Sequence, residues 1–102
     1  TGETNREIWR KEGLVADITA RTVSVDGAPA PMSPKEYDLF FCLLKNRNIA
    51  LSREKLIEKV WGYDFPGDDR TLDTHVKRLR KSLGAYAKFI VTLRGLGYRF
   101  EG

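Results

Sequence analysis

The stretch that most constrains this chain runs from Asp68 to Leu83 and has opposite chemistry on its two sides. At helical spacing, its apolar residues form one narrow stripe: Leu72, Val76, Leu79 and Leu83. Basic and polar residues point away from that stripe: Arg70, Thr74, Lys77, Arg78 and Lys81. The pattern predicts an amphipathic helix over 68–83 that packs its stripe on a core and turns a basic face outward.

Acidic residues support this helix at its start and along its surface. Asp68 or Asp69 is placed to cap the N-terminus, and Asp73 lies one turn before Lys77, an order that favours the helix. A charged outer face can also do no more than solvate a surface helix. Its interpretation as a binding surface therefore rests on the rest of the chain.

The whole chain has a net charge of +4, and its positive charge is concentrated in the last third. Residues 1–69 hold ten basic and twelve acidic residues, a balance of minus two, whereas residues 70–102 hold eight basic and two acidic ones, a balance of plus six. Such segregation is typical of a protein that binds a polyanion, most often nucleic acid. An anionic membrane surface is the rival partner, but the apolar stripe is narrow and the core requires it.

Length and composition predict one globular domain, at 102 residues and 41% hydrophobic content. Residues 1–7 are polar and are interpreted as the stub of a linker, which leaves 8–102 as the domain. Without a membrane-length apolar run or a signal peptide, the expected location is the cytoplasm. One cysteine, Cys42, excludes an internal disulfide, and a single histidine excludes a Cys/His zinc site. No nucleophile arrangement or dinucleotide fingerprint is present, so we predict neither an enzyme nor a cofactor.

The first third of the chain has short β-type runs at 8–9, 14–19, 22–25 and 29–31. Asp26-Gly27 is a hairpin signal between two of them. Prolines at 29 and 31 place the last run at an edge. These residues predict a small antiparallel sheet.

Two further helices and a hairpin are predicted around the basic helix. The first helix begins with Ser33 as cap, Pro34 at the first helical position and Glu36 closing a capping box. It is apolar on nearly all sides, so we expect it at the centre of the core, with Cys42 as a small buried hydrophobe. The second begins at its cap Ser52 and ends at Gly62. Runs at 89–93 and 98–100, joined by the turn 94–97, predict the hairpin.

Three helices followed by a hairpin describe an α+β winged helix-turn-helix, with the small antiparallel sheet at its N-terminus. The sequence resembles the effector domains of OmpR/PhoB-type response regulators. The matching stretches are MSPKEYDLF from Met32, LSREKLIEKVWG from Leu51, DDRTLDTHVKRLRKSL from Asp68 and VTLRGLGYRF from Val91. Their order and spacing make the resemblance specific.

The resemblance implies a bacterial transcription factor that binds double-stranded promoter DNA as the effector domain of a two-component response regulator. Its implied partners are a receiver domain of the same protein, a second copy on tandem half-sites, and RNA polymerase through the loop 62–69. The helix 68–83 would be the recognition helix in the major groove, and the hairpin 89–100 the wing at the minor groove.

Site residues follow from the resemblance by position. Thr74 and Arg78 would face bases, and Arg94 would enter the minor groove. The positions near phosphates or the DNA backbone are Trp61, Arg70, Thr71, His75, Lys77, Arg80, Thr92 and Tyr98.

The side chains themselves favour related roles and leave alternatives open. Arg78 has the fork geometry for guanine, and Thr74 can use its methyl or its hydroxyl. Lys77, Arg80 and Lys81 suit phosphate contacts, although Lys81 can simply be solvated. A core-edge hydrogen bond competes with a phosphate contact for His75.

Three other functions are alternatives to DNA binding: catalysis, protein binding and RNA binding. An enzyme lacks support in the sequence. A winged helix used only for protein contact would turn its basic face toward an acidic partner. RNA binding is disfavoured, because the hairpin lacks an exposed aromatic platform for stacking bases. Gly95 and Gly97 lie in a hairpin turn, so we attribute them to turn geometry and not to a phosphate loop.

Overall fold

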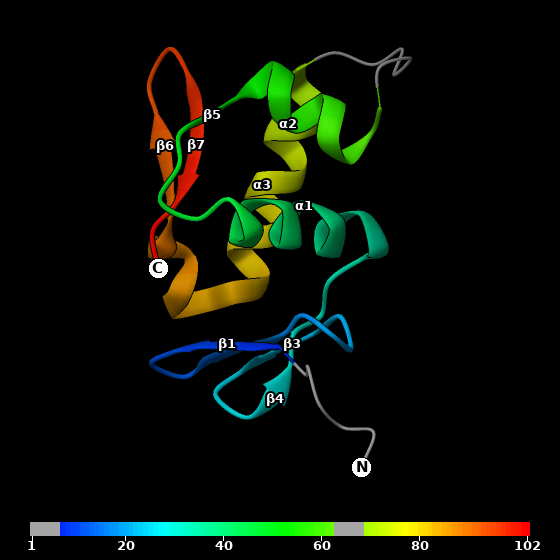
Figure 1. Ribbon diagram of the computed structural model, residues 1–102, viewed down its shortest axis with the longest axis vertical. Helices are drawn as coiled ribbons and strands as arrows, with labels where there is room; N and C mark the ends of the chain where they lie inside the picture. The colour runs from blue at the N-terminus through cyan, green and yellow to red at the C-terminus, as the bar shows by residue number, and fades with distance from the viewer. Residues whose placement is uncertain (1–6, 63–68) are drawn as a thin grey trace.

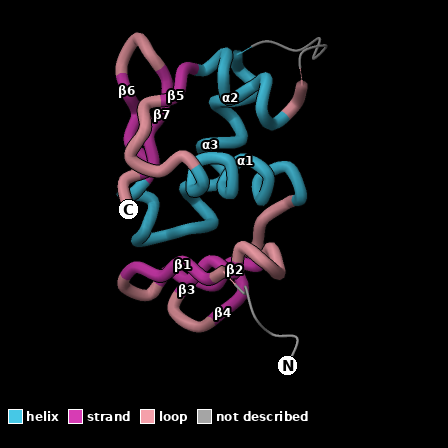
Figure 2. The backbone as a smooth tube through the Cα atoms, in the orientation of Figure 1, coloured by secondary structure: helices cyan, strands magenta, loops and turns pink. Residues whose placement is uncertain are grey.

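The computed structural model describes residues 7–62 and 69–102 of the chain (Figure 1). An N-terminal sheet lies at one end of the molecule, the helices occupy the middle, and the C-terminal hairpin runs along one side. Figure 2 shows the same separation, with the strands gathered at two places, at one end and along one side of the helices. This is the predicted α+β winged helix-turn-helix.

The N-terminal sheet is an antiparallel meander over the described residues, in the order β1 (Ile8–Lys11), β2 (Leu14–Asp17), β3 (Thr22–Val25) and β4 (Ala28–Pro29). Val25 pairs with Ala28, so Asp26 and Gly27 alone form the turn, both with positive φ, at 52° and 87°. This confirms the hairpin signal. The strand predicted at 29–31 is wrong in position, because pairing begins at Ala28 and ends at Pro29.

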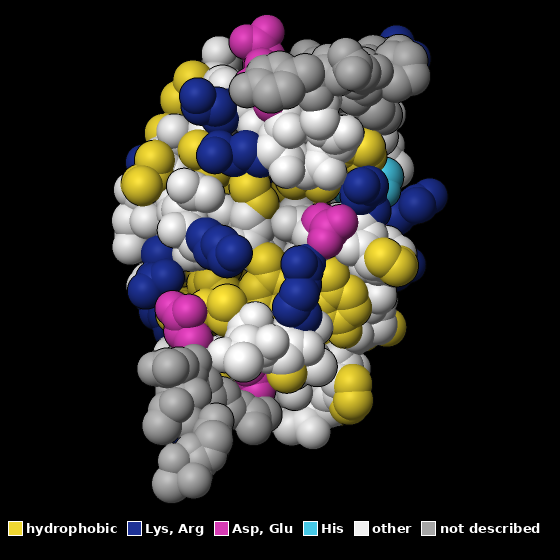
Figure 3. Space-filling view, turned by 45° about the vertical axis from the view of Figure 1, so that its right-hand side comes forward, with side chains coloured by type: hydrophobic (Ala, Val, Ile, Leu, Met, Phe, Trp, Pro, Cys, Tyr) yellow, Lys and Arg dark blue, Asp and Glu magenta, His cyan; other side chains and the backbone are white. Residues whose placement is uncertain are grey.

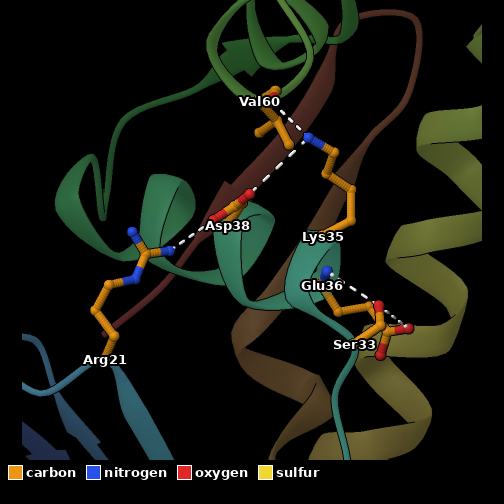
Figure 4. A network of polar contacts seen from close by, with 6 residues as sticks. All are labelled: Arg21, Ser33, Lys35, Glu36, Asp38 and Val60. Carbon is orange, nitrogen blue, oxygen red and sulfur yellow. Dashed lines mark hydrogen bonds and ion pairs between the residues drawn. The ribbon is translucent and has the colours of Figure 1, made fainter.

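Helices α1 (Pro34–Lys45) and α2 (Arg53–Val60) start where their caps predict. Ser33 Oγ accepts a hydrogen bond from the Glu36 N–H at 3.3 Å and donates one to the Glu36 carboxylate at 3.0 Å (Figure 4). Ser52 caps α2 by accepting from the Lys55 N–H at 3.0 Å. Gly62 follows α2 with a φ of 100°, which confirms the expected left-handed end.

Helix α3 (Asp69–Leu83) carries the basic face, and its apolar stripe is buried as predicted. Leu72, Val76, Leu79 and Leu83 are at most 1% exposed. The described part of the helix begins at Asp69. Asp68 and the side chain of Asp69 lie outside the described residues, so the N-cap remains a prediction.

Helix α1 supplies much of the core, yet its burial is less complete than predicted. Leu39, Phe40, Leu43 and Leu44 have no exposed surface. The expectation of a buried Cys42 is wrong, because this side chain is only partly buried and lies on the outer side of α1. Desolvation nonetheless raises the pKa of its thiol.

The wing consists of β6 (Ile90–Leu93) and β7 (Gly97–Phe100), and a short strand that the sequence does not predict, β5 (Leu51–Ser52), pairs with β7. A 3-10 helix over Gly84–Phe89, also unpredicted, leads into it. Gly97 is required for packing and not only for the turn: a Cβ there would lie 2.0 Å from the Leu51 carbonyl oxygen. Its attribution to turn geometry alone is therefore wrong.

Candidate nucleic-acid interface

One side of α3 is exposed and basic. The buried stripe anchors the other side, so the orientation of the exposed side chains follows from the helical repeat. The structure exposes five of the predicted site residues on this helix: Arg70, Thr74, Lys77, Arg78 and Lys81. Helix α3 therefore presents a row of cations and one hydroxyl to solvent, and none of these side chains is needed for core packing.

His75 and Thr71 lie at the margin of this face and contact each other. The His75 Nδ1 lies 2.8 Å from the Thr71 carbonyl oxygen, where its N–H donates. The ring also meets Trp61 edge-on, with 5.0 Å between the ring centroids. The core-edge hydrogen bond considered for His75 is thus present. A phosphate contact would use Nε2, which carries a proton in this arrangement only when the ring is protonated.

Arg80 links α3 to the wing. Its Nη2 donates to the Ile90 carbonyl oxygen and to Thr92 Oγ1, both at 2.7 Å. Its guanidinium also lies 5.8 Å from the centroid of the Tyr98 ring. Two of the predicted phosphate contacts, Arg80 and Thr92, therefore lie side by side where helix and wing meet.

Tyr98 is only 7% exposed, and its hydroxyl points inward. It donates to Asp73 Oδ1 at 2.8 Å, and the other Asp73 oxygen pairs with Arg53 from the start of α2. Burial, and then the bond to Asp73, raises the pKa of Tyr98 from 10.0 to about 12. A contact between this hydroxyl and a DNA backbone would have to compete with Asp73.

Asp73 and Arg53 are the residues that sequence reasoning missed. With Tyr98 they join α2, α3 and the wing. Asp73 was expected to support α3 through Lys77. The one sequence signal for this role was an acidic residue in the middle of a largely basic helix.

The wing ends in an exposed cation. The Leu96 N–H donates to the Leu93 carbonyl oxygen at 2.9 Å, and Gly95 closes this turn with a φ of 76°. Arg94 is exposed at the tip. Most of the loop 62–69 lies outside the described residues, so the structure leaves its predicted contact with RNA polymerase untested.

The described residues show neither a metal site nor a membrane-spanning helix. They contain no group of three or more His, Cys, Asp or Glu side chains that could hold a metal ion. None of their helices is both long enough and apolar enough to span a bilayer. Exposed guanidinium, ammonium and hydroxyl groups suit phosphates and base edges.

Comparisons with known proteins agree on one family. The family described as "Transcriptional regulatory protein, C terminal" matches residues 27–100. The uncharacterized transcriptional regulatory protein YclJ of Bacillus subtilis is 48% identical over 99 residues, which are 95% of this chain and 44% of YclJ. The transcriptional regulatory protein ResD of the same organism is 48% identical over 92 residues, 86% of this chain and 38% of ResD. The chain thus spans less than half the length of these relatives.

Solved structures share the fold. The DNA-binding domain of Klebsiella pneumoniae RstA, in complex with the RstA box, has a TM-score of 0.80 and 28% identity, covering 93% of this chain and 97% of that one. The response regulator DrrB of Thermotoga maritima, an OmpR/PhoB homolog, has a TM-score of 0.83 and 31% identity, covering 93% of this chain and 44% of that one.

Proposed function

The chain belongs to the OmpR/PhoB-type family of transcriptional regulatory C-terminal domains, and we propose that it binds double-stranded promoter DNA sequence-specifically as the effector domain of a two-component response regulator. The exposed basic face of α3, held by a fully buried stripe beside an exposed cation on the wing, carries this proposal. The RstA domain, which shares the fold, is described in complex with its DNA box.

In this proposal α3 lies in the major groove, with Thr74 and Arg78 toward base edges. Phosphates are met by residues around it: Trp61, Arg70, Thr71, His75, Lys77, Arg80, Lys81 and Thr92. Arg94 enters the minor groove. The backbone contact proposed for Tyr98 comes from its ring edge or requires its hydroxyl to leave Asp73.

The rest of the proposal concerns the longer protein. The relatives are more than twice the length of this chain, which gives room for a receiver domain. We place residues 8–102 as the binding unit and 1–7 in a linker toward that receiver. A second copy on tandem half-sites and RNA polymerase, met by the loop 62–69, complete the assembly in the cytoplasm. We assign the domain no catalytic activity and no cofactor.

Duplex DNA affinity is expected to fall steeply with salt, because bound lysines and arginines release counterions from the phosphates. Lys77→Ala should weaken binding to all sequences about equally and reduce the logarithmic salt slope by about one unit. The affinity is measured by titration over a salt series. Lys45→Ala is the matched control, since it removes one exposed lysine from α1 and should leave the slope nearly unchanged. A salt-independent affinity of the parent chain would refute the proposed binding mode.

Arg78→Ala is expected to lose about 1 to 3 kcal/mol of discrimination at one base pair, the usual value of a bidentate contact. The selected site and its single-base variants are compared with parent and mutant chains. Equal weakening on every variant would make Arg78 a phosphate contact and not a base-reading residue.

Arg94→Ala is expected to reduce the preference for A/T-rich sequence beside the site of α3, because narrow minor grooves concentrate negative potential. The preferred bases under Thr74 and Arg78 should not change. Selection from a random duplex library measures both preferences. Arg99→Ala is the control, since this wing residue pairs with Glu101 at 2.9 Å. Identical flanking preferences for Arg94→Ala and the parent would contradict the minor-groove role.

A further inference from the structure

A cavity of about 390 Å³ opens on the outer face of α1, outside the proposed DNA surface. Its α1 residues, among them Phe41, Cys42 and Lys45, recur at helical spacing and form one stripe. Val60 and Lys59 close it from the end of α2, and Arg21 from the connection between β2 and β3. Figure 3 shows a face on which hydrophobic side chains lie open between Lys and Arg side chains.

The rim of this cavity carries uncompensated positive charge. Asp38 is the one carboxylate among the described residues that line it, and Arg21 already meets it at 2.6 Å, with Lys35 at 4.0 Å on the other side (Figure 4). Lys45 and Lys59 are exposed and form no ion pair with any carboxylate that the structure describes. Both lysines act on the Cys42 thiol in the direction that lowers its pKa, against the larger effect of burial, so their charge reaches the interior of the cavity.

The DNA surface does not account for these charges. The proposed DNA surface is formed by the exposed side chains of α3, and no described α3 residue lines the cavity. The cavity lies on the side of α1 away from its buried leucines. The walls are also partly apolar, through Phe41, Val60 and Cys42. A surface that only tracked phosphates would have no use for an apolar wall.

We propose that this cavity is a docking site for an acidic segment of a partner protein, with one large apolar side chain of the segment inside and carboxylates beside Lys45 and Lys59. The volume is at the small end for ligand pockets and suits a side chain more than a folded surface. Unpaired lysines on the rim attract and orient an acidic peptide. Burial of the peptide's apolar side chain against the apolar wall adds to the affinity.

Peptide selection tests the charge and the apolar anchor together. A displayed library of random heptapeptides is selected on the chain, with counter-selection on a Lys45→Glu/Lys59→Glu variant to remove peptides that bind the basic face of α3. We expect the enriched peptides to combine acidic residues with a large aliphatic or aromatic residue. Selection on the doubly substituted variant, with counter-selection on the parent chain, should yield basic peptides in their place.

One enriched peptide is then synthesised for binding measurements. Lys59→Glu should weaken it by roughly tenfold or more, as for a rim charge that becomes repulsive, and added salt should weaken it further. Lys55→Glu is the matched control, because Lys55 is exposed on the same helix but lies outside the cavity. Amide NMR spectra of each variant verify the fold, and Lys→Gln variants replace any that unfolds.

The NMR titration also locates the site. Shifts at Phe41, Cys42 and Val60 are expected with the peptide. The proposal is overturned if no peptide survives counter-selection, if the survivors lack acidic residues, or if the shifts map to α3. It is equally overturned if inorganic phosphate or duplex DNA, and not the peptide, shifts the cavity amides. None of these readouts depends on promoter binding.

Discussion

Phe40→Ala is expected to lower the free energy of unfolding by roughly 3 to 5 kcal/mol, the usual cost of truncating a buried phenylalanine. The ring has no exposed surface. It meets Phe41 and Phe100 edge-on, with centroid distances of 5.5 and 5.6 Å, and so joins α1 to β7 of the wing. Such a loss is a large part of the stability of a small domain. Urea denaturation of parent and mutant measures it.

Leu96→Ala serves as the control, because this large apolar side chain is 47% exposed at the wing tip. Its truncation should change the free energy of unfolding by no more than about 0.5 kcal/mol. A Phe40→Ala variant as stable as Leu96→Ala would contradict the packing of the wing on α1. Loss of DNA binding by Phe40→Ala at temperatures where it is unfolded would say nothing about the interface itself.

Much of the fold was predictable because its signals are local. Ser33, Pro34 and Glu36 lie within one turn, and the cap geometry that they predict is the one observed. Asp26-Gly27 likewise encodes its turn without help from the rest of the chain. The stripe of α3 repeats often enough to determine which side is buried.

The unpredicted parts depend on contacts between distant segments. Strand β5 has two residues, and it exists because Leu51 pairs with Tyr98 on β7. Tyr86, in the unpredicted 3-10 helix, donates to Asp26 at 2.5 Å and accepts from the Gly13 N–H at 3.1 Å, across sixty or more residues. No local pattern contains such pairs.

The candidate site divides in the same way. Helical periodicity alone placed Thr74, Lys77 and Arg78 outward, and the structure exposes them. It could not show that Arg80 and Thr92 bind each other, or that Tyr98 is turned toward Asp73. Those contacts depend on the angle between α3 and the wing, which packing of the whole domain determines.

Asp73→Ala is expected to have the second large effect, a loss of roughly 1 to 4 kcal/mol in the free energy of unfolding. A buried donor left unsatisfied costs about 1 to 3 kcal/mol, and an ion pair at the surface adds at most about 1. The donor is the Tyr98 hydroxyl. The ion pair is the one with Arg53, whose side chain is 40% exposed, as Asp73 is 42%. Denaturant titration measures the change.

Asp73→Asn separates the two contributions, because an amide oxygen still accepts from Tyr98 but no longer neutralises Arg53. It should cost less than Asp73→Ala. In a double-mutant cycle, Asp73→Ala and Tyr98→Phe should couple by about 0.5 to 3 kcal/mol. Additive effects of these two substitutions would mean that the hydrogen bond contributes nothing.

Alkaline pH gives an independent measure of the same bond. The pKa of Tyr98 is raised by burial and by Asp73, so the folded state favours the protonated phenol. Its contribution to stability is therefore complete below pH 10.0 and is lost as the pH rises toward about 12. The ultraviolet absorbance of phenolate should show a tyrosine that titrates near 12, and Tyr98→Phe should remove it. Titration of that tyrosine at its ordinary pKa would contradict the inward hydroxyl.

Asp73→Ala should also change DNA recognition, although Asp73 faces the wing and not the groove. Without it, α3 and the hairpin keep the Arg80 contacts with Ile90, Thr92 and the Tyr98 ring but lose the Asp73 bond, so their relative angle is less fixed. Library selection under conditions where the variant is folded should then show the same bases under Arg78, but a broader range of spacings between that site and the A/T-rich flank of Arg94. Asp38→Ala is the control, because it removes a paired carboxylate from α1 that has no contact with the wing network. It should leave the range of selected spacings as narrow as in the parent chain. If both variants select one and the same spacing, the Asp73 network stabilises the domain without setting the geometry of its reading surfaces.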